Sequence, residues 1–115
     1  MMWQGIDRRR FPRAEYPCEV IILRSDLKET FRTHTENIGV GGICVILSKE
    51  LPRFCPVGIT LYLKDRVSPI ECDGRIVWSV KRRSNFDTGI EFIGLRQRDR
   101  LRIERVVEEC LRKGL

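Results

Sequence analysis

A long stretch in the second half of the chain alternates apolar and polar side chains with a period of two. From Ile70 to Val80, the even-numbered positions are apolar or small, and most odd-numbered positions carry charged or hydroxyl groups. This pattern is typical of a β-strand that buries one face. It predicts that Ile76, Trp78 and Val80 face the core, and that the chain folds around a sheet.

Five further strands are predicted along the chain. Residues 57–63 and 86–92 alternate in the same way, residues 18–23 and 43–47 are apolar on both faces, and residues 30–37 are rich in threonine. Turn-forming residues lie between successive runs. Six short strands with hairpin-length connections indicate an antiparallel barrel or sandwich, and closure into a barrel removes exposed edges.

The period of the pattern changes near the C-terminus, where apolar residues follow one face of a helix. These residues are Ile103, Val106, Val107, Cys110 and Leu111. The helix is expected to pack on the barrel or to pair with a partner helix. We therefore predict an all-β fold with a C-terminal helix in one domain over residues 1–115. A basic N-terminal segment would occupy residues 1–14, the six-stranded antiparallel barrel residues 15–94, and the helical segment residues 95–115.

The composition excludes several classes of protein. The 115 residues are 42% hydrophobic and 33% charged, which suits one folded core and argues against disorder. The five cysteines are odd in number and have no zinc-site spacing, and there is one histidine, His34. No stretch has the length of a signal peptide or a membrane span. We expect a soluble, cytoplasmic protein without a metal or cofactor.

The basic residues suggest an anionic partner. Lys and Arg exceed Asp and Glu by 22 to 16, a net charge of +6. Arg8, Arg9, Arg10 and Arg13 surround a stiff Phe-Pro step. Arginine holds phosphate, or the O6/N7 edge of guanine, through two parallel hydrogen bonds. A solvated basic tail is the simpler interpretation of the cluster taken alone.

A second candidate segment runs from Asn37 to Gly42 between two predicted strands, with the sequence Asn-Ile-Gly-Val-Gly-Gly. Glycines allow a ligand to approach the backbone closely, and exposed amides in such a turn can bind an anion. For a glycine turn alone, a tight hairpin is the simpler interpretation.

Together the two segments resemble the motifs of the PilZ domain family, an RxxxR followed by [DN]xSxxG. Arg9 and Arg13 match the first motif. Asn37 and Gly42 match the second, with Gly39 where the family usually has serine. The resemblance implies that the arginines hold phosphate and guanine edges and that the asparagine hydrogen-bonds a guanine. The two glycines would shape the turn that admits the ligand.

The resemblance covers almost the whole chain, from about Arg8 to Lys113, and includes the strand sequences at residues 73–78 and 88–92. It implies a six-stranded split barrel with a C-terminal helix that binds the bacterial second messenger cyclic di-GMP. Arg8 and Arg10, which flank the first motif arginine, would be secondary ligand residues that add stacking or a phosphate contact.

Gly39 leaves two alternatives for the turn. If its φ is positive, a serine there would be strained. If its φ is ordinary, a serine hydroxyl should tighten binding, and Gly41 and Gly42 are the positions that need glycine's freedom. We favour the second alternative, because the family's usual serine shows that an L-residue fits this turn.

We expect a non-enzymatic cyclic di-GMP receptor, since no catalytic triad is evident around the single histidine. Its arginine segment, residues 7–14, would become ordered on the ligand, and its output would be a contact with an unknown protein. It would be a monomer or weak dimer. The alternatives are a ligand-free adapter of the same family and a nucleic-acid-binding barrel. Nucleic acid is less expected because most aromatic residues alternate inward. Affinity and the number of bound nucleotides stay open.

Overall fold

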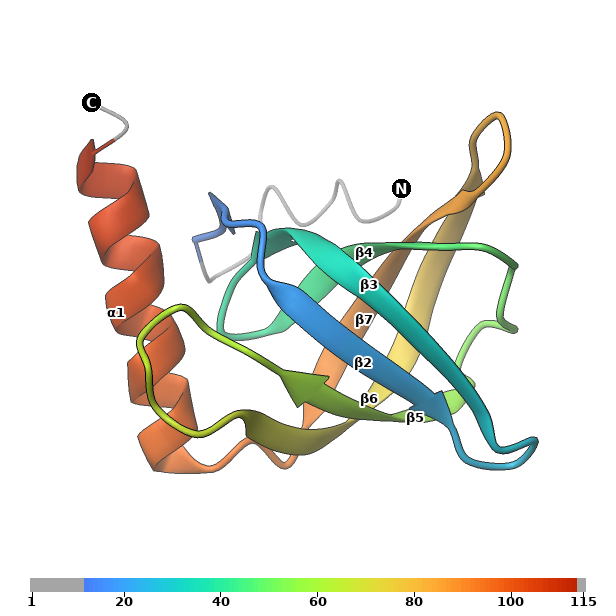
Figure 1. The fold of residues 1–115 in the computed structure, drawn as a ribbon, viewed down its shortest axis with the longest axis horizontal. Coiled ribbons are helices and arrows are strands. Elements are labelled where there is room, and N and C mark those ends of the chain that lie inside the picture. Colours follow the sequence, from blue (N-terminus) through green and yellow to red (C-terminus); the bar gives the residue numbers. More distant parts are fainter. Residues whose placement is uncertain (1–11, 114–115) are drawn as a thin grey trace.

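Every predicted strand forms, and so does the C-terminal helix (Figure 1). The computed structural model describes residues 12–113. The elements are β1 (Ala14–Glu15), β2 (Glu19–Arg24), β3 (Glu29–Ile38), β4 (Gly42–Leu47), β5 (Pro56–Leu61), β6 (Ile70–Lys81), β7 (Phe86–Ile93) and α1 (Gln97–Lys113). The predicted fold class, a six-stranded antiparallel barrel with one helix, is confirmed, with β1 as an additional short strand.

The strands form one antiparallel sheet in the order β1-β3-β2-β5-β6-β7-β4. Strand β3 also pairs with β4, which closes the sheet into a barrel. The sequence does not predict β1, which pairs with the far end of β3 so that Ala14 lies opposite Ile38 and Glu15 opposite Asn37.

The barrel interior is filled by branched aliphatic side chains from alternate strand positions. Burying each of them fully contributes about 1.5–3 kcal/mol. Those with no or almost no exposed surface include Val20, Ile22, Ile38, Ile43, Val45, Leu47, Leu61, Ile70, Ile76 and Ile90.

One prediction for β6 is wrong. The register between β6 and β7 shifts between Ile76 and Trp78, so that Val77 is an extra residue, as in a β-bulge. The side-chain alternation therefore reverses beyond the bulge. Ile76 lies in the core as predicted, but Trp78 is only half-buried and Val80 is 43% exposed.

Helix α1 lies beside the barrel (Figure 1) and buries Ile103, Val106 and Val107, as its apolar period predicts. Its buried face is shorter than predicted, because Cys110 is half-buried and Leu111 is 44% exposed.

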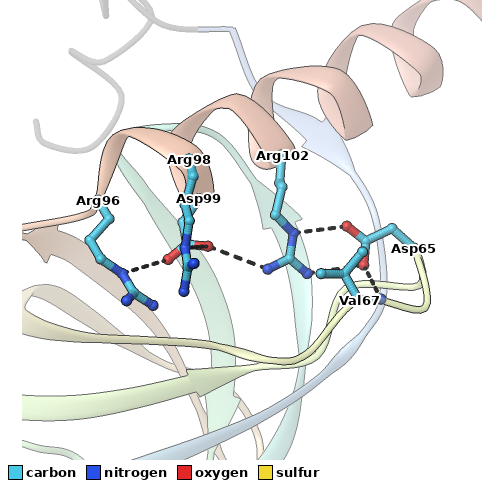
Figure 2. A network of polar contacts seen from close by, with 6 residues as sticks. All are labelled: Asp65, Val67, Arg96, Arg98, Asp99 and Arg102. Carbon is cyan, nitrogen blue, oxygen red and sulfur yellow. Dashed lines mark hydrogen bonds and ion pairs between the residues drawn. The ribbon is translucent and has the colours of Figure 1, made fainter.

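A polar network joins the start of α1 to the connection between β5 and β6 (Figure 2). Arg102 donates to both carboxylate oxygens of Asp65, at 3.0 Å each, and to Asp99 at 3.3 Å. The side chain of Asp99 is 3% exposed and also accepts from Arg96 at 3.3 Å. The hydrogen bonds from Arg102 hold the pKa of Asp65 below its usual value. The network therefore fixes the first turns of the helix against the barrel.

The five cysteines are free thiols, and Cys18, Cys44 and Cys55 are buried. Within residues 12–113, no group of His, Cys, Asp and Glu is arranged to hold a metal ion. Over the same residues, no helix has both the length and the apolar character needed to cross a membrane.

Candidate functional site

Strand β1 brings the arginine segment to the glycine turn. Because Ala14 pairs with Ile38, the last residue of β3, Arg13 lies beside Gly39, the residue that follows this strand. The Nη1 of Arg13 donates to the Oδ1 of Asn37 at 2.9 Å. Two residues that the motifs assign to one site, 24 positions apart in the sequence, are therefore in direct contact.

A buried threonine holds the chain in this position. The Thr35 hydroxyl donates to the carbonyl of Tyr16 at 2.5 Å and accepts from the backbone N–H of Cys18 at 3.0 Å. These bonds fix the chain on both sides of Pro17, in the short connection between β1 and β2. Arg13 is thus presented from a backbone that is anchored to β3.

The glycine turn has an ordinary backbone. Gly39 donates its N–H to the carbonyl of Gly42 at 3.0 Å, which closes the β3–β4 hairpin, so this amide is not open to an anion. Among the glycines of residues 12–113, only Gly94 has a positive φ, at 72°. The ordinary φ favoured for Gly39 is therefore correct. The reason given for it, that an L-residue fits this turn, does not hold, because a Cβ there would lie 2.8 Å from the Pro12 carbonyl oxygen. Tighter binding by a serine at this position stays a prediction. Gly41 and Gly42, the positions expected to need glycine's freedom, do not have a positive φ either.

The glycines are instead required by close approach. A Cβ on Gly42 would lie 2.1 Å from the carbonyl oxygen of Ile90, because the backbone of β7 passes directly against the turn. A Cβ on Gly39 would lie 2.8 Å from the carbonyl oxygen of Pro12 and 3.1 Å from the Cγ of Arg13. Glycine at position 39 therefore lets the arginine segment lie on the turn.

A row of paired residues runs across the outer face of the barrel from the turn to β6. Asn37 pairs with Cys44, Cys44 with Gly89, and Gly89 with Trp78. Paired residues point to the same side of a sheet. The residues on either side of Gly89 are fully buried in the core, so the row faces outward.

Trp78 lies over Gly89 in this row. A Cβ on Gly89 would lie 2.2 Å from the Nε1 of Trp78 and 2.4 Å from its Cε2, so the indole occupies the space above the glycine. With strands about 4.8 Å apart, Asn37 and Trp78 are separated by about 14 Å of barrel surface. Sequence reasoning placed Trp78 in the core and did not single it out as a candidate site residue. Apolar Val77, which breaks the alternation, was the available signal.

Cys44 is buried at the middle of the row. The pKa of its thiol is raised to about 12, chiefly by burial and also by the carboxylates of Asp87 and Glu36, while Arg13 opposes this effect. The thiol is therefore neutral, and Arg13 supplies positive charge beside it. The buried centre of the row, at Cys44, is therefore uncharged, while Arg13, Asp87 and Glu36 place charges around it.

The structure thus brings together Arg13, Asn37 and Gly39, with Gly42 closing the same turn. The other predicted ligand residues, Arg8, Arg9 and Arg10, lie outside the described residues.

The sequence of the chain matches one protein-family model, described as the PilZ domain, over residues 7–109. No curated protein matches it in sequence.

Several solved structures share the fold. The inhibitor of motility MotI/DgrA from Bacillus subtilis is 19% identical with a TM-score of 0.76, and the match covers 93% of this chain and 51% of that one. YcgR from Escherichia coli in complex with c-di-GMP is 17% identical with a TM-score of 0.77, covering 93% and 47%. The K. pneumonia MrkH–c-di-GMP complex is 18% identical with a TM-score of 0.78, covering 93% and 54%. The chain therefore spans about half the length of these proteins.

Proposed function

Because the chain belongs to the PilZ domain family, we propose that it is a non-enzymatic receptor that binds cyclic di-GMP on the outer face between Arg13 and Trp78. The contact between Arg13 and Asn37 carries the proposal, because it joins the two motif segments at one place on the surface. The solved complexes of YcgR and MrkH with c-di-GMP, which share the fold, support the choice of ligand.

The chemistry of these side chains suits the ligand. Cyclic di-GMP has two phosphates and two guanines, and a guanidinium group can bind either by paired hydrogen bonds. The Oδ1 of Asn37 already accepts from Arg13. Its amide nitrogen is the group that would donate to a guanine O6 or N7. One arginine and one asparagine would thus hold one half of the ligand.

Trp78 would hold the other half. An indole is a stacking platform, and base stacking on an aromatic side chain contributes about 1–3 kcal/mol. The indole of Trp78 lies over Gly89 of β7, whereas the backbone of Trp78 is in β6, one strand farther from Asn37. The distance that the ligand must bridge between the indole and Asn37 is therefore shorter. A ligand with two bases can therefore contact both ends of the row.

The remaining arginines of the cluster, Arg8, Arg9 and Arg10, would close over the bound ligand, because its phosphates neutralise their mutual repulsion. The surface formed in this way would then bind or release a partner protein. The five free thiols suit a receptor in the reducing cytoplasm.

Calorimetric titration with cyclic di-GMP and cyclic di-AMP tests the proposal. We expect saturable binding of cyclic di-GMP with little dependence on salt, and rejection of cyclic di-AMP, whose adenine lacks the O6 acceptor. Equal binding of the two ligands would refute recognition of guanine edges. Binding of neither would favour the ligand-free adapter.

Fluorescence of Trp78 tests the position of the ligand. In a Trp3→Phe background, Trp78 is the remaining tryptophan. We expect cyclic di-GMP to quench its emission with the affinity found by calorimetry. Trp78→Ala should weaken binding about tenfold, and Trp78→Phe, which keeps an aromatic ring, should weaken it less. Calorimetric binding without any change in emission would mean that the ligand lies elsewhere.

A further inference from the structure

The connection between β4 and β5 holds a phenylalanine out in solvent. Phe54 is 58% exposed, and its φ of 70° lies in the left-handed region that bulky side chains rarely adopt. Its backbone N–H donates to the carbonyl of Ile76 at 2.7 Å, which fixes this conformation against β6. A non-glycine residue held in this region is strained, and such residues cluster at functional sites.

Two arginines lie against the Phe54 ring. The guanidinium carbon of Arg53 is 5.0 Å from the ring centroid, and that of Arg75 is 5.7 Å away. Both distances allow cation–π attraction. Arg75 also forms an ion pair with Glu91, whereas Arg53 forms none with residues 12–113. An exposed aromatic ring is therefore flanked by two cations, one of which has no carboxylate partner in that range.

This cluster adjoins the candidate site without belonging to it. Arg75 pairs with Glu91, and Glu91 pairs with Gly42, so the three residues form the neighbouring row on the outer face. The β4–β5 connection itself lies at the side of the barrel away from α1 (Figure 1).

We propose that Arg53, Phe54 and Arg75 form a docking surface for an acidic segment of a partner protein that also carries an apolar side chain. Arginine and large aromatic residues contribute most of the binding energy at protein interfaces. The apolar side chain would pack on the ring of Phe54. Carboxylates would pair with Arg53 and compete with Glu91 for Arg75. The proposal does not depend on cyclic di-GMP binding.

A nucleic acid fits this surface less well. Proteins that bind single strands stack successive bases on a series of aromatic side chains. Among residues 12–113, the most exposed aromatic side chains are Phe54 and Tyr62, the latter 36% exposed, while Trp78 is half-buried over Gly89. Phe54 and Tyr62 lie at opposite ends of β5, about 20 Å apart, so these two rings cannot hold neighbouring bases. One ring between two arginines is better suited to one apolar side chain with acidic neighbours.

Nuclear magnetic resonance of the isotope-labelled protein tests this surface with three probes. They are a short synthetic peptide of Asp, Glu, Leu and Phe, the same peptide with lysine in place of each acidic residue, and single-stranded oligo(dT). We expect the acidic peptide to shift the amide resonances of residues 53–55 and Arg75, and the lysine peptide to leave them unchanged. Shifts located elsewhere, equal binding of the lysine peptide, or tighter binding of oligo(dT) would overturn the proposal.

Two variants separate docking from a structural role. Phe54→Gly removes the ring and relieves the positive φ, so it should melt no lower than wild type and bind the acidic peptide at least about tenfold more weakly. Leu27→Ala is the matched control, because Leu27 is 57% exposed in another turn, and it should bind as wild type does. A lower melting temperature of Phe54→Gly with unchanged binding would identify a structural residue and overturn the proposal.

Discussion

Three glycines with different surroundings allow a graded test of the close approaches at the candidate site. Gly58 has only the Cβ of Leu23 near the position of an added Cβ, at the ordinary distance of 3.8 Å. At Gly39 the added Cβ would lie 2.8 Å from the Pro12 carbonyl oxygen, and at Gly42 it would lie 2.1 Å from the Ile90 oxygen. Alanine at the three positions should therefore have three different effects.

The magnitudes follow from what must move. At Gly39, Pro12 and Arg13 must retreat by about 0.6 Å to reach an ordinary contact of 3.4 Å. That shift lengthens the 2.9 Å bond between Arg13 and Asn37 to the limit of a hydrogen bond. Its loss costs about 0.5–1.5 kcal/mol, which lowers the melting temperature by about 2–10 °C.

At Gly42 the obstacle is the backbone of β7, which is paired on both sides. A displacement of about 1.3 Å would break hydrogen bonds between β4 and β7, so we expect a loss of at least about 3 kcal/mol. Gly58→Ala should be neutral or stabilise by up to about 1 kcal/mol, because alanine restricts the unfolded chain.

Thermal melting followed by circular dichroism, without ligand, measures all three variants. The expected order of melting temperatures is Gly58→Ala at or above wild type, then Gly39→Ala, then Gly42→Ala. Equal melting of Gly42→Ala and Gly58→Ala would refute the close approach of β7. A wild-type melting temperature for Gly39→Ala would mean that Pro12 and Arg13 do not rest on the turn.

The remaining predictions concern single side chains. Arg13→Ala should weaken cyclic di-GMP binding at least about tenfold in calorimetry, whereas Arg32→Ala, which removes an exposed arginine with a 3.9 Å ion pair, should not. Asp65→Asn should lower the free energy of unfolding by about 1–3 kcal/mol at neutral pH, because Arg102 loses a charged acceptor. Arg102 lowers the pKa of Asp65 in the folded protein. The stabilisation from this ion pair is therefore complete above the ordinary pKa of 3.8 and is lost as the pH falls through the lowered pKa of the folded state. In an acid titration, the free energy of unfolding should therefore fall more steeply below the ordinary pKa of Asp65 in wild type than in Asp65→Asn. Cys44 should resist thiol reagents at pH 8 in the folded protein and react after unfolding, because burial raises its pKa to about 12.

The strands could be predicted because each buries a side-chain pattern that is visible locally. Ile59 and Leu61 in β5 alternate with small or polar neighbours, and the structure buries both. The reversal in β6 could not be predicted in the same way. A β-bulge depends on how β7 pairs with β6, and both Trp78 and Val77 are apolar, so either could have faced the core.

The contact between Arg13 and Asn37 was predictable from the motifs, but its cause was not. Strand β1 has two residues, too few to show a period, and its pairing with β3 is long-range. The sequence could not show why position 39 is glycine, because the contact that requires it is also long-range. Its neighbour is Pro12, 27 positions earlier in the numbering of the chain.

Strand β1 also limits how the proposed switch can work. Ala14 and Glu15 are paired with β3, and Thr35 fixes the chain just beyond them, so these residues are already ordered without ligand. In the proposed switch, a conformational change on ligand binding would therefore exclude residues 13–14 of the predicted segment. Arg13 is the first residue on the anchored side that contacts the site, and its bond to Asn37 exists before the ligand arrives. The ligand would then find this part of its site preformed, so binding would carry no cost of ordering Arg13.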